Sequence, residues 1–117
     1  MSGVTNDLVK KSKEISETFS DAEYDVLVSS SVQMSCSLIA GSLNHLGYKS
    51  RSWMAWQVPI LTEGNHSSAR IIEIKKNNIK KYLKLGGIPV ITGFQGLNAN
   101  HRITTLGRGG SDSSAIM

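Results

Sequence analysis

The stretch GGIPVITGFQG, residues 86–96, decides the fold class of this chain. Residues 88–92 within it form a short apolar run rich in β-branched side chains, which is typical of a buried strand in a parallel sheet. The glycine pair that precedes the run ends a helix predicted over 77–85. A helix that leads into a buried strand indicates an α/β fold, and open α/β sheets bind ligands where their strands end. We therefore expect a ligand site at the turn over 93–96.

The rest of the chain also alternates between helix and strand. A first helix is predicted to begin at Thr5 or Asn6 and a second to span about 23–46, followed by strands over 49–53 and 70–74. We expect the second helix to break in its serine run, at Ser29, Ser30 and Ser31, and to end at Gly47. Four of its apolar side chains are expected to face inward: Leu38, Ile39, Leu43 and Leu46. This order predicts a mainly parallel sheet with helices on both faces.

The stretch TTLGRGGSDSS, residues 104–114, is the richest candidate for a binding site. Its glycines permit positive φ, so that backbone N–H groups can converge on an anion at the start of a following helix. Arg108 adds a planar fork that matches a carboxylate or a phosphate. Asp112 would repel a pure phosphate, so its presence favours a ligand that also carries an ammonium group, such as an amino acid. The alternative is an ordinary helix N-cap after a turn.

These residues resemble the signature of the aspartokinases, which are members of the amino acid kinase family. Gly93-Phe94-Gln95-Gly96 and the stretch over 104–115 follow the pattern G-F-x-G…T-T-L-G-R-G-G-S-D-x-[ST]-A. In the same order along the chain, residues 1–8 are similar to the family's S-A-M-S-G-V-T-N-x-L segment. Further similarities lie at Gln33-Met34-Ser35, Trp56-Gln57 and 69–72. The resemblance covers essentially the whole chain and implies a partial three-layer amino-acid kinase fold.

The resemblance implies an aspartate kinase, which transfers the γ-phosphoryl group of ATP to the β-carboxylate of L-aspartate. This reaction is the first step of lysine, methionine and threonine biosynthesis. Arg108 would bind the aspartate carboxylate, Ser111 would hydrogen-bond the substrate, and Asp112 would be the catalytic residue that orients the amino group or a lysine. The other substrate-binding residues that the resemblance implies are Gly3, Thr5, Phe94, Gly109 and Gly110. The implied partner is L-aspartate, and the family's cofactors are ATP and Mg²⁺.

Two positions depart from the family pattern. Val32 stands where the G-E-Q-x-S motif has a glutamate that contacts the substrate, so a charged partner for the amino group is replaced by an apolar side chain. Pro59 replaces the glycine of the W-Q-A-G-I turn, and proline fixes φ and lacks an N–H donor. We therefore expect weakened aspartate binding and a reshaped turn.

Several parts of the family pattern have no counterpart within these 117 residues. They are the K-F-G-G-[ST] loop whose lysine binds phosphates, the nucleotide-binding half and the regulatory ACT domains. We therefore expect residues 1–117 to be a fragment of the aspartate-binding part of the catalytic domain, inactive alone and binding no ATP or Mg²⁺ alone. Its further partners would be the remaining parts of the enzyme or a second copy. The alternatives are a non-catalytic remnant, one piece of a split enzyme, or a basic binding module.

Length, charge and the distribution of apolar residues limit the kinds of function that this chain can have. At 117 residues and 39% hydrophobic, the chain is long enough for one domain with a modest core. The net charge of +4 raises the question of nucleic acid, but five lysines within 75–84 read as the solvated face of one helix. No apolar run approaches the roughly 20 residues that span a bilayer, and no export signal opens the chain. We expect a cytoplasmic protein with neither nucleic acid nor membrane as a partner.

The cysteine and the histidines carry no metal signature. Cys36 is the single cysteine, so it cannot form an internal disulfide, and its helical context predicts a small buried side chain. His45, His66 and His101 lie far apart in the sequence, without the spacing of metal ligands. We expect no metal site formed by these residues.

Overall fold

The structure is a computed structural model that describes residues 2–106, with side chains from residue 6 onward. Within that range the elements in chain order are α1 (Ser2–Ile15), α2 (Asp21–His45), β1 (Ser50–Trp53), β2 (Ile60–Glu63), β3 (Arg70–Ile74), α3 (Asn77–Lys84), β4 (Ile88–Ile91), β5 (Gln95–Leu97) and β6 (Ile103–Thr105).

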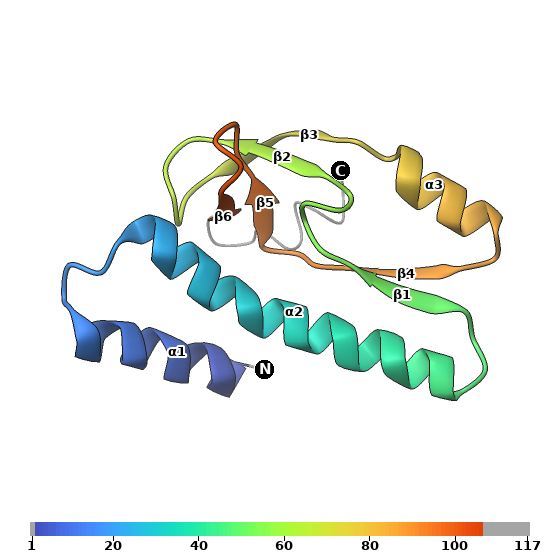
Figure 1. Cartoon of the computed structure of the whole chain (residues 1–117), viewed down its shortest axis with the longest axis horizontal. Helices are drawn as coiled ribbons and strands as arrows, with labels where there is room; N and C mark the ends of the chain where they lie inside the picture. Colours follow the sequence, from blue (N-terminus) through green and yellow to red (C-terminus); the bar gives the residue numbers. More distant parts are fainter. Residues whose placement is uncertain (1, 107–117) are drawn as a thin grey trace.

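The described strands form two sheets. β1 and β4 pair in parallel, and the other four strands are ordered β3-β2-β5-β6. In that second sheet β2 pairs antiparallel with β3 and parallel with β5, while β5 and β6 form an antiparallel hairpin. Figure 1 shows α1 and α2 side by side beneath the strands and α3 on the other side of β1 and β4. The predicted α/β class with helices on both faces is confirmed, with antiparallel pairs added to the parallel ones.

Helix α2 is continuous, so the predicted break at its serine run is wrong. Four of its serine hydroxyls donate to carbonyls of their own helix: Ser30 to Leu27 (2.6 Å), Ser31 to Val28 (2.9 Å), Ser35 to Ser31 (3.2 Å) and Ser42 to Leu38 (2.7 Å). Hydroxyls that bond back to the preceding turn leave the backbone ladder intact. The helix α1 also begins earlier than predicted, at Ser2 rather than at Thr5 or Asn6.

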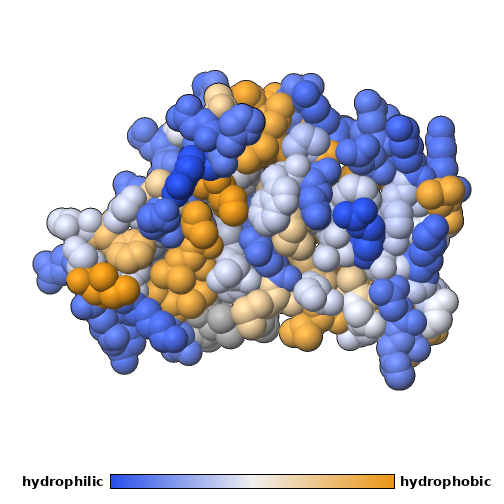
Figure 2. Space-filling model, in the orientation of Figure 1, coloured by the Kyte–Doolittle hydropathy of each residue, from blue (hydrophilic) through white to orange (hydrophobic). Residues whose placement is uncertain are grey.

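The inward face of α2 consists of small and polar side chains. Its buried residues are Asp25, Val28, Ser29, Ser31, Cys36 and Ala40. Three of the four residues predicted to face inward are exposed instead: Leu38, Ile39 and Leu46. Figure 2 shows apolar side chains at the surface over α1 and α2. The small buried residues let α2 lie close to β1 and β6, which it contacts.

Helix α2 is also long and apolar enough to cross a membrane, by length and composition alone, with a mean hydropathy of 1.4 over an 18-residue window. Core helices of globular domains meet the same criterion. In this chain α2 packs against α1, β1, β4 and β6, and its Asp25 is fully buried. A buried carboxylate with protein partners is a feature of a packed domain core.

The main apolar core lies beside β1 and β2. Its buried members are Trp53, Ala55, Val58 and Ile60, against which Ile71, Ile74, Ile79 and Tyr82 pack. The β4 strand borders this core but is not buried on both faces as predicted, because Ile88 and Ile91 are 39% and 41% exposed. Thr92, directly after β4, is fully buried and begins the polar interior described next.

Candidate functional site

Three consecutive residues at the end of β6 are each held by a different part of the fold. Thr104 Oγ1 shares a 2.6 Å hydrogen bond with Thr62 Oγ1 of β2. Thr105 is bonded to Asp25 of α2, and the Leu106 N–H donates to the Phe94 carbonyl at 2.9 Å. All three residues are at least 96% buried. The chain therefore reaches Gly107, where the glycine stretch begins, from a firmly fixed position.

Asp25 is the centre of this arrangement. Its carboxylate is 0% exposed and accepts five hydrogen bonds. Thr105 donates from its N–H (3.0 Å) and its hydroxyl (2.8 Å). Ser67 donates from its N–H (3.1 Å) and its hydroxyl (3.1 Å), and His66 Nδ1 donates at 2.7 Å. We call Asp25, His66, Ser67 and Thr105 the Asp25 anchor, because it joins α2, the β2–β3 turn and β6.

The turn between β2 and β3 is shaped to reach this carboxylate. Ser67 has a φ of +67°, a left-handed conformation that is uncommon for a residue other than glycine. Directly after the turn, the Ala69 N–H donates to the Thr105 carbonyl at 3.1 Å. The N–H, carbonyl and hydroxyl of Thr105 are thus all bonded within the protein. A residue satisfied in this way is a rigid support for the segment that follows it.

The turn after β4 forms the second wall of the site. Phe94 is half-buried and has a φ of +68°, a conformation that is energetically costly for a bulky residue. Residues in such strained conformations cluster at functional sites in proteins. The neighbouring Gln95 is buried. Its Oε1 accepts from the Ala55 N–H (3.2 Å) and the Thr92 hydroxyl (3.1 Å), and its Nε2 donates to the Ser29 carbonyl (3.4 Å). Gln95 thus links this turn to α2.

Val32 lies on the same face of α2 as the anchor. Residues four and seven positions apart share a helix face, so Asp25, Ser29 and Val32 form one line along α2. Asp25 bonds the end of β6, Ser29 bonds Gln95, and Val32 follows one turn later, half-buried. Val32 therefore shares the helix face whose other members bond the end of β6 and the turn after β4.

The structure describes only part of the predicted site. Arg108, Gly109, Gly110, Ser111 and Asp112 lie outside the described residues. Gly3 and Thr5 lie in the first turns of α1, where only the backbone is described. The carbonyl of Phe94 accepts the Leu106 N–H at 2.9 Å, so Phe94 lies beside the last described residue before the glycine stretch.

No group of three or more His, Cys, Asp or Glu side chains able to hold a metal ion occurs in the described part of the chain. Cys36 is buried as predicted, and burial raises the pKa of its thiol above the ordinary value of 9.0. A protonated, buried thiol is a packing residue rather than a nucleophile.

Sequence reasoning missed Asp25, His66 and Gln95 as members of the site. The sequence does contain one indication that Asp25 is buried. It shares a helix face with Val28, Ser29 and Val32, none of which is charged. A carboxylate at an inward helix position must find donors elsewhere in the fold. The identity of those donors, about 40 and 80 residues away, is not encoded in any local pattern.

The sequence of this chain is similar to a known protein family and to several aspartokinases. Residues 1–117 match the amino acid kinase family. The chain is 48% identical to an aspartokinase of Rickettsia conorii over 120 residues, which is 100% of this chain and 30% of that protein. It is 44% identical to an aspartokinase of Geobacillus stearothermophilus, covering 99% of this chain and 28% of that protein. The chain thus spans about 30% of the length of these relatives.

Solved structures of aspartokinases share the fold of this chain. The crystal structure of E. coli aspartokinase III in complex with aspartate and ADP superposes with a TM-score of 0.74 at 25% identity, over 95% of this chain and 26% of that one. The aspartate kinase of Synechocystis gives a TM-score of 0.73 at 33% identity, over 96% of this chain and 18% of that one. The family match over all 117 residues, together with this shared fold, establishes that the chain belongs to the amino acid kinase family.

Proposed function

We propose that this chain is the L-aspartate-binding segment of an aspartate kinase, the enzyme that phosphorylates the β-carboxylate of aspartate with ATP. The observation that carries the proposal is the fixation of Thr104, Thr105 and Leu106 directly before the glycine stretch. A segment held this firmly gives a ligand site a rigid support, which ligand binding requires. The similarity to an aspartokinase crystallised with aspartate supports the same substrate.

In the proposed site, Arg108 binds the aspartate carboxylate through its planar fork. Gly109 and Gly110 let the backbone approach the ligand, and Ser111 donates a hydrogen bond to it. Asp112 orients the amino group or a lysine, Thr5 and the Gly3 backbone contact the substrate from the start of α1, and Phe94 forms a wall. The whole arrangement depends on the Asp25 anchor, which fixes the strand end that leads into Arg108.

ATP with Mg²⁺ would supply the phosphoryl group in the complete enzyme. The described residues do not fit that role, because they hold no cluster of metal-ligating side chains and because a phosphate-binding lysine loop of the family's pattern is not among the 117 residues. We assign this chain only to substrate binding and orientation, with no phosphoryl transfer by the chain alone. Its proposed partners are the remaining parts of such an enzyme or a second copy, in the cytoplasm.

Isothermal calorimetry with L-aspartate tests the proposal. We expect weak binding to the chain, with a Kd of roughly millimolar order. Arg108→Gln should abolish detectable heat. Val32→Glu should strengthen binding about tenfold or more, since a hydrogen bond to a charged group contributes about 1.5–3 kcal/mol.

Arg102→Gln is the matched control. Arg102 lies six positions before Arg108 in the sequence, and its guanidinium pairs with Glu23 at 2.9 Å in an exposed position. The control should bind L-aspartate as the unmodified chain does. Equal affinity in the Arg108→Gln variant and the unmodified chain would refute the placement of Arg108 in the site.

A further inference from the structure

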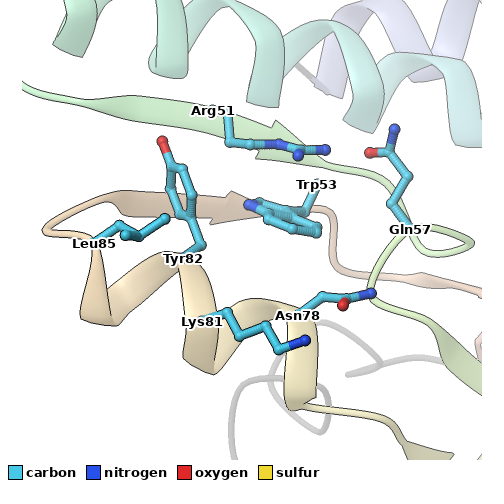
Figure 3. Close-up of a pocket in the computed structure, with 7 residues that line it drawn as sticks. All are labelled: Arg51, Trp53, Gln57, Asn78, Lys81, Tyr82 and Leu85. Atoms are coloured by element: carbon cyan, nitrogen blue, oxygen red, sulfur yellow. The ribbon is translucent and has the colours of Figure 1, made fainter.

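A pocket lies between β1 and α3, away from the Asp25 anchor. Its volume is about 490 Å³, within the range of small-molecule sites. Arg51 and Trp53 of β1, Gln57 of the following turn, and Asn78, Lys81 and Tyr82 of α3 line it (Figure 3). None of these residues has a role in the proposed aspartate site.

Arg51 is held in place on the ring of Trp53. The guanidinium carbon lies 3.7 Å from the ring centroid, and Nε donates to the Ser52 carbonyl at 3.4 Å. Stacking of this kind fixes the plane of the guanidinium while its outer N–H groups stay available. Trp53 is itself fixed, since it is 6% exposed and packs edge-to-face on Tyr82 with centroids 5.8 Å apart. The cation is therefore oriented before any ligand arrives.

The other polar groups of the pocket are also donors. Gln57 Oε1 already accepts from the Met54 N–H at 2.9 Å, which leaves the NH₂ of its amide as the free group. In Figure 3 the guanidinium of Arg51 lies over the face of Trp53, and the amides of Gln57 and Asn78 lie toward the side of Trp53 away from Tyr82. The amine of Lys81 is drawn on the opposite side of the Trp53 ring from Arg51. No carboxylate lies within ion-pair distance of Arg51 or Lys81 among the described residues.

The surroundings of the pocket are positively charged. Seven cationic side chains lie on and beside α3 and β1, and none of them forms an ion pair in the described part of the chain: Lys49, Arg51, Lys75, Lys76, Lys80, Lys81 and Lys84. The α3 end of the molecule is correspondingly mostly hydrophilic in Figure 2. A concave site with one sign of charge concentrates ligands of the opposite sign.

We infer that this pocket binds a small molecule bearing a phosphate or diphosphate group. Arg51 supplies the two-point fork that matches phosphate oxygens, and Lys81 supplies a point charge. The amide groups of Gln57 and Asn78 add neutral donors. Among the residues that the structure describes, no carboxylate lines this pocket, which separates it from the amino-acid site, where Asp112 is predicted to face an ammonium group.

The test is a titration of the full ¹⁵N-labelled chain with inorganic pyrophosphate, in which binding is measured by the amide chemical shifts in ¹⁵N–¹H NMR spectra. We expect shifts at Arg51, Gln57, Asn78 and Lys81, and at the indole N–H of Trp53. Arg51→Gln removes the two-point fork and should weaken binding at least tenfold, and Lys81→Gln removes one charge-assisted hydrogen bond and should weaken binding about tenfold.

Lys75→Gln and Lys84→Gln are the charge-matched controls, since Lys75 precedes α3 and Lys84 is its last residue, but neither lines the pocket. They should weaken binding less than about twofold, the effect of a screened, more distant charge. Equal weakening by all four variants would show a diffuse basic surface and overturn the inference, as would the absence of any shift at millimolar pyrophosphate. Lys81 is exposed on α3, so its variant tests the site even if Arg51→Gln disturbs the packing of Trp53.

Discussion

Replacing Asp25 by alanine should be among the most damaging single changes in this chain. The change removes a fully buried carboxylate and leaves five donors without their acceptor. The two donors of Thr105 are buried, whereas those of His66 and Ser67 lie near the surface, where water can reach them. A buried donor left unsatisfied costs about 1–3 kcal/mol, so the two together cost about 2–6 kcal/mol.

That loss is large relative to the whole stability of a domain, which is typically about 5–15 kcal/mol. In urea denaturation followed by tryptophan fluorescence at low micromolar protein, the midpoint of Asp25→Ala should fall by about 1 M or more. Asp25→Asn keeps the shape and one acceptor oxygen, so its loss should be smaller, about 1–3 kcal/mol. This milder variant should remain folded and bind L-aspartate more weakly, because the end of β6 is less firmly held.

Glu73→Ala is the matched control. Glu73 is an exposed carboxylate on β3, and its removal should change the free energy of unfolding by less than about 0.5 kcal/mol. If Asp25→Ala and Glu73→Ala unfold at the same urea concentration as the unmodified chain, then the Asp25 anchor does not stabilise the fold and the reasoning fails.

Further substitutions and conditions test other parts of the structure. In Gly96→Ala the new Cβ would clash with Thr62 Cγ2 and lie 3.2 Å from the Ile60 carbonyl oxygen, so thermal unfolding should show a loss of about 1–3 kcal/mol. Thr92→Val removes hydrogen bonds to the Trp53 carbonyl (3.3 Å) and Gln95 Oε1 (3.1 Å), and should cost about 1–3 kcal/mol in urea denaturation. Burial raises the pKa of Cys36 above 9.0, so folding favours the protonated thiol and the unfolding free energy should decrease as the pH rises above 9.0; unchanged stability there would contradict this. In an ATP-dependent hydroxamate assay the chain alone should show no aspartate kinase turnover, and turnover that Arg108→Ala abolishes would disprove this.

Several elements could be predicted from the sequence because local chemistry determines them. The strand at β3 has its predicted bounds, and α3 ends within one residue of its predicted end. Gly47 and Gly86 follow α2 and α3 with φ of +94° and +82°, conformations that glycine adopts without steric cost. The burial of Cys36 also followed from its helical context.

Other features depend on contacts between distant segments. The inward face of α2 could not be read from hydrophobicity, because close packing against β1 and β6 selects small residues there while Leu38 and Ile39 stay exposed. The strands β2, β5 and β6 are only three or four residues long and carry little periodicity of their own. They exist because they pair with one another.

The candidate site also has one part that local sequence predicts and one part that depends on distant contacts. Its glycine stretch is predicted from residue types and order alone, since glycines, one guanidinium and one carboxylate together indicate a zwitterionic ligand, and Arg108 and Asp112 lie outside the described residues. The Asp25 anchor could not, because Asp25 and Thr105 are 80 positions apart in the sequence. Only the fold shows that the carboxylate and the strand end meet.

An NMR titration of the ¹⁵N-labelled chain with L-aspartate tests the proposed aspartate site directly. We expect the amides of Gly107, Arg108, Gly109 and Gly110 to shift together with that of Phe94, while the amides of α3 do not shift. These shifts should disappear in Arg108→Gln and weaken in Asp25→Asn. Shifts confined to α3 and β1, or no shifts at millimolar L-aspartate, would contradict the assignment of the glycine stretch as the aspartate site.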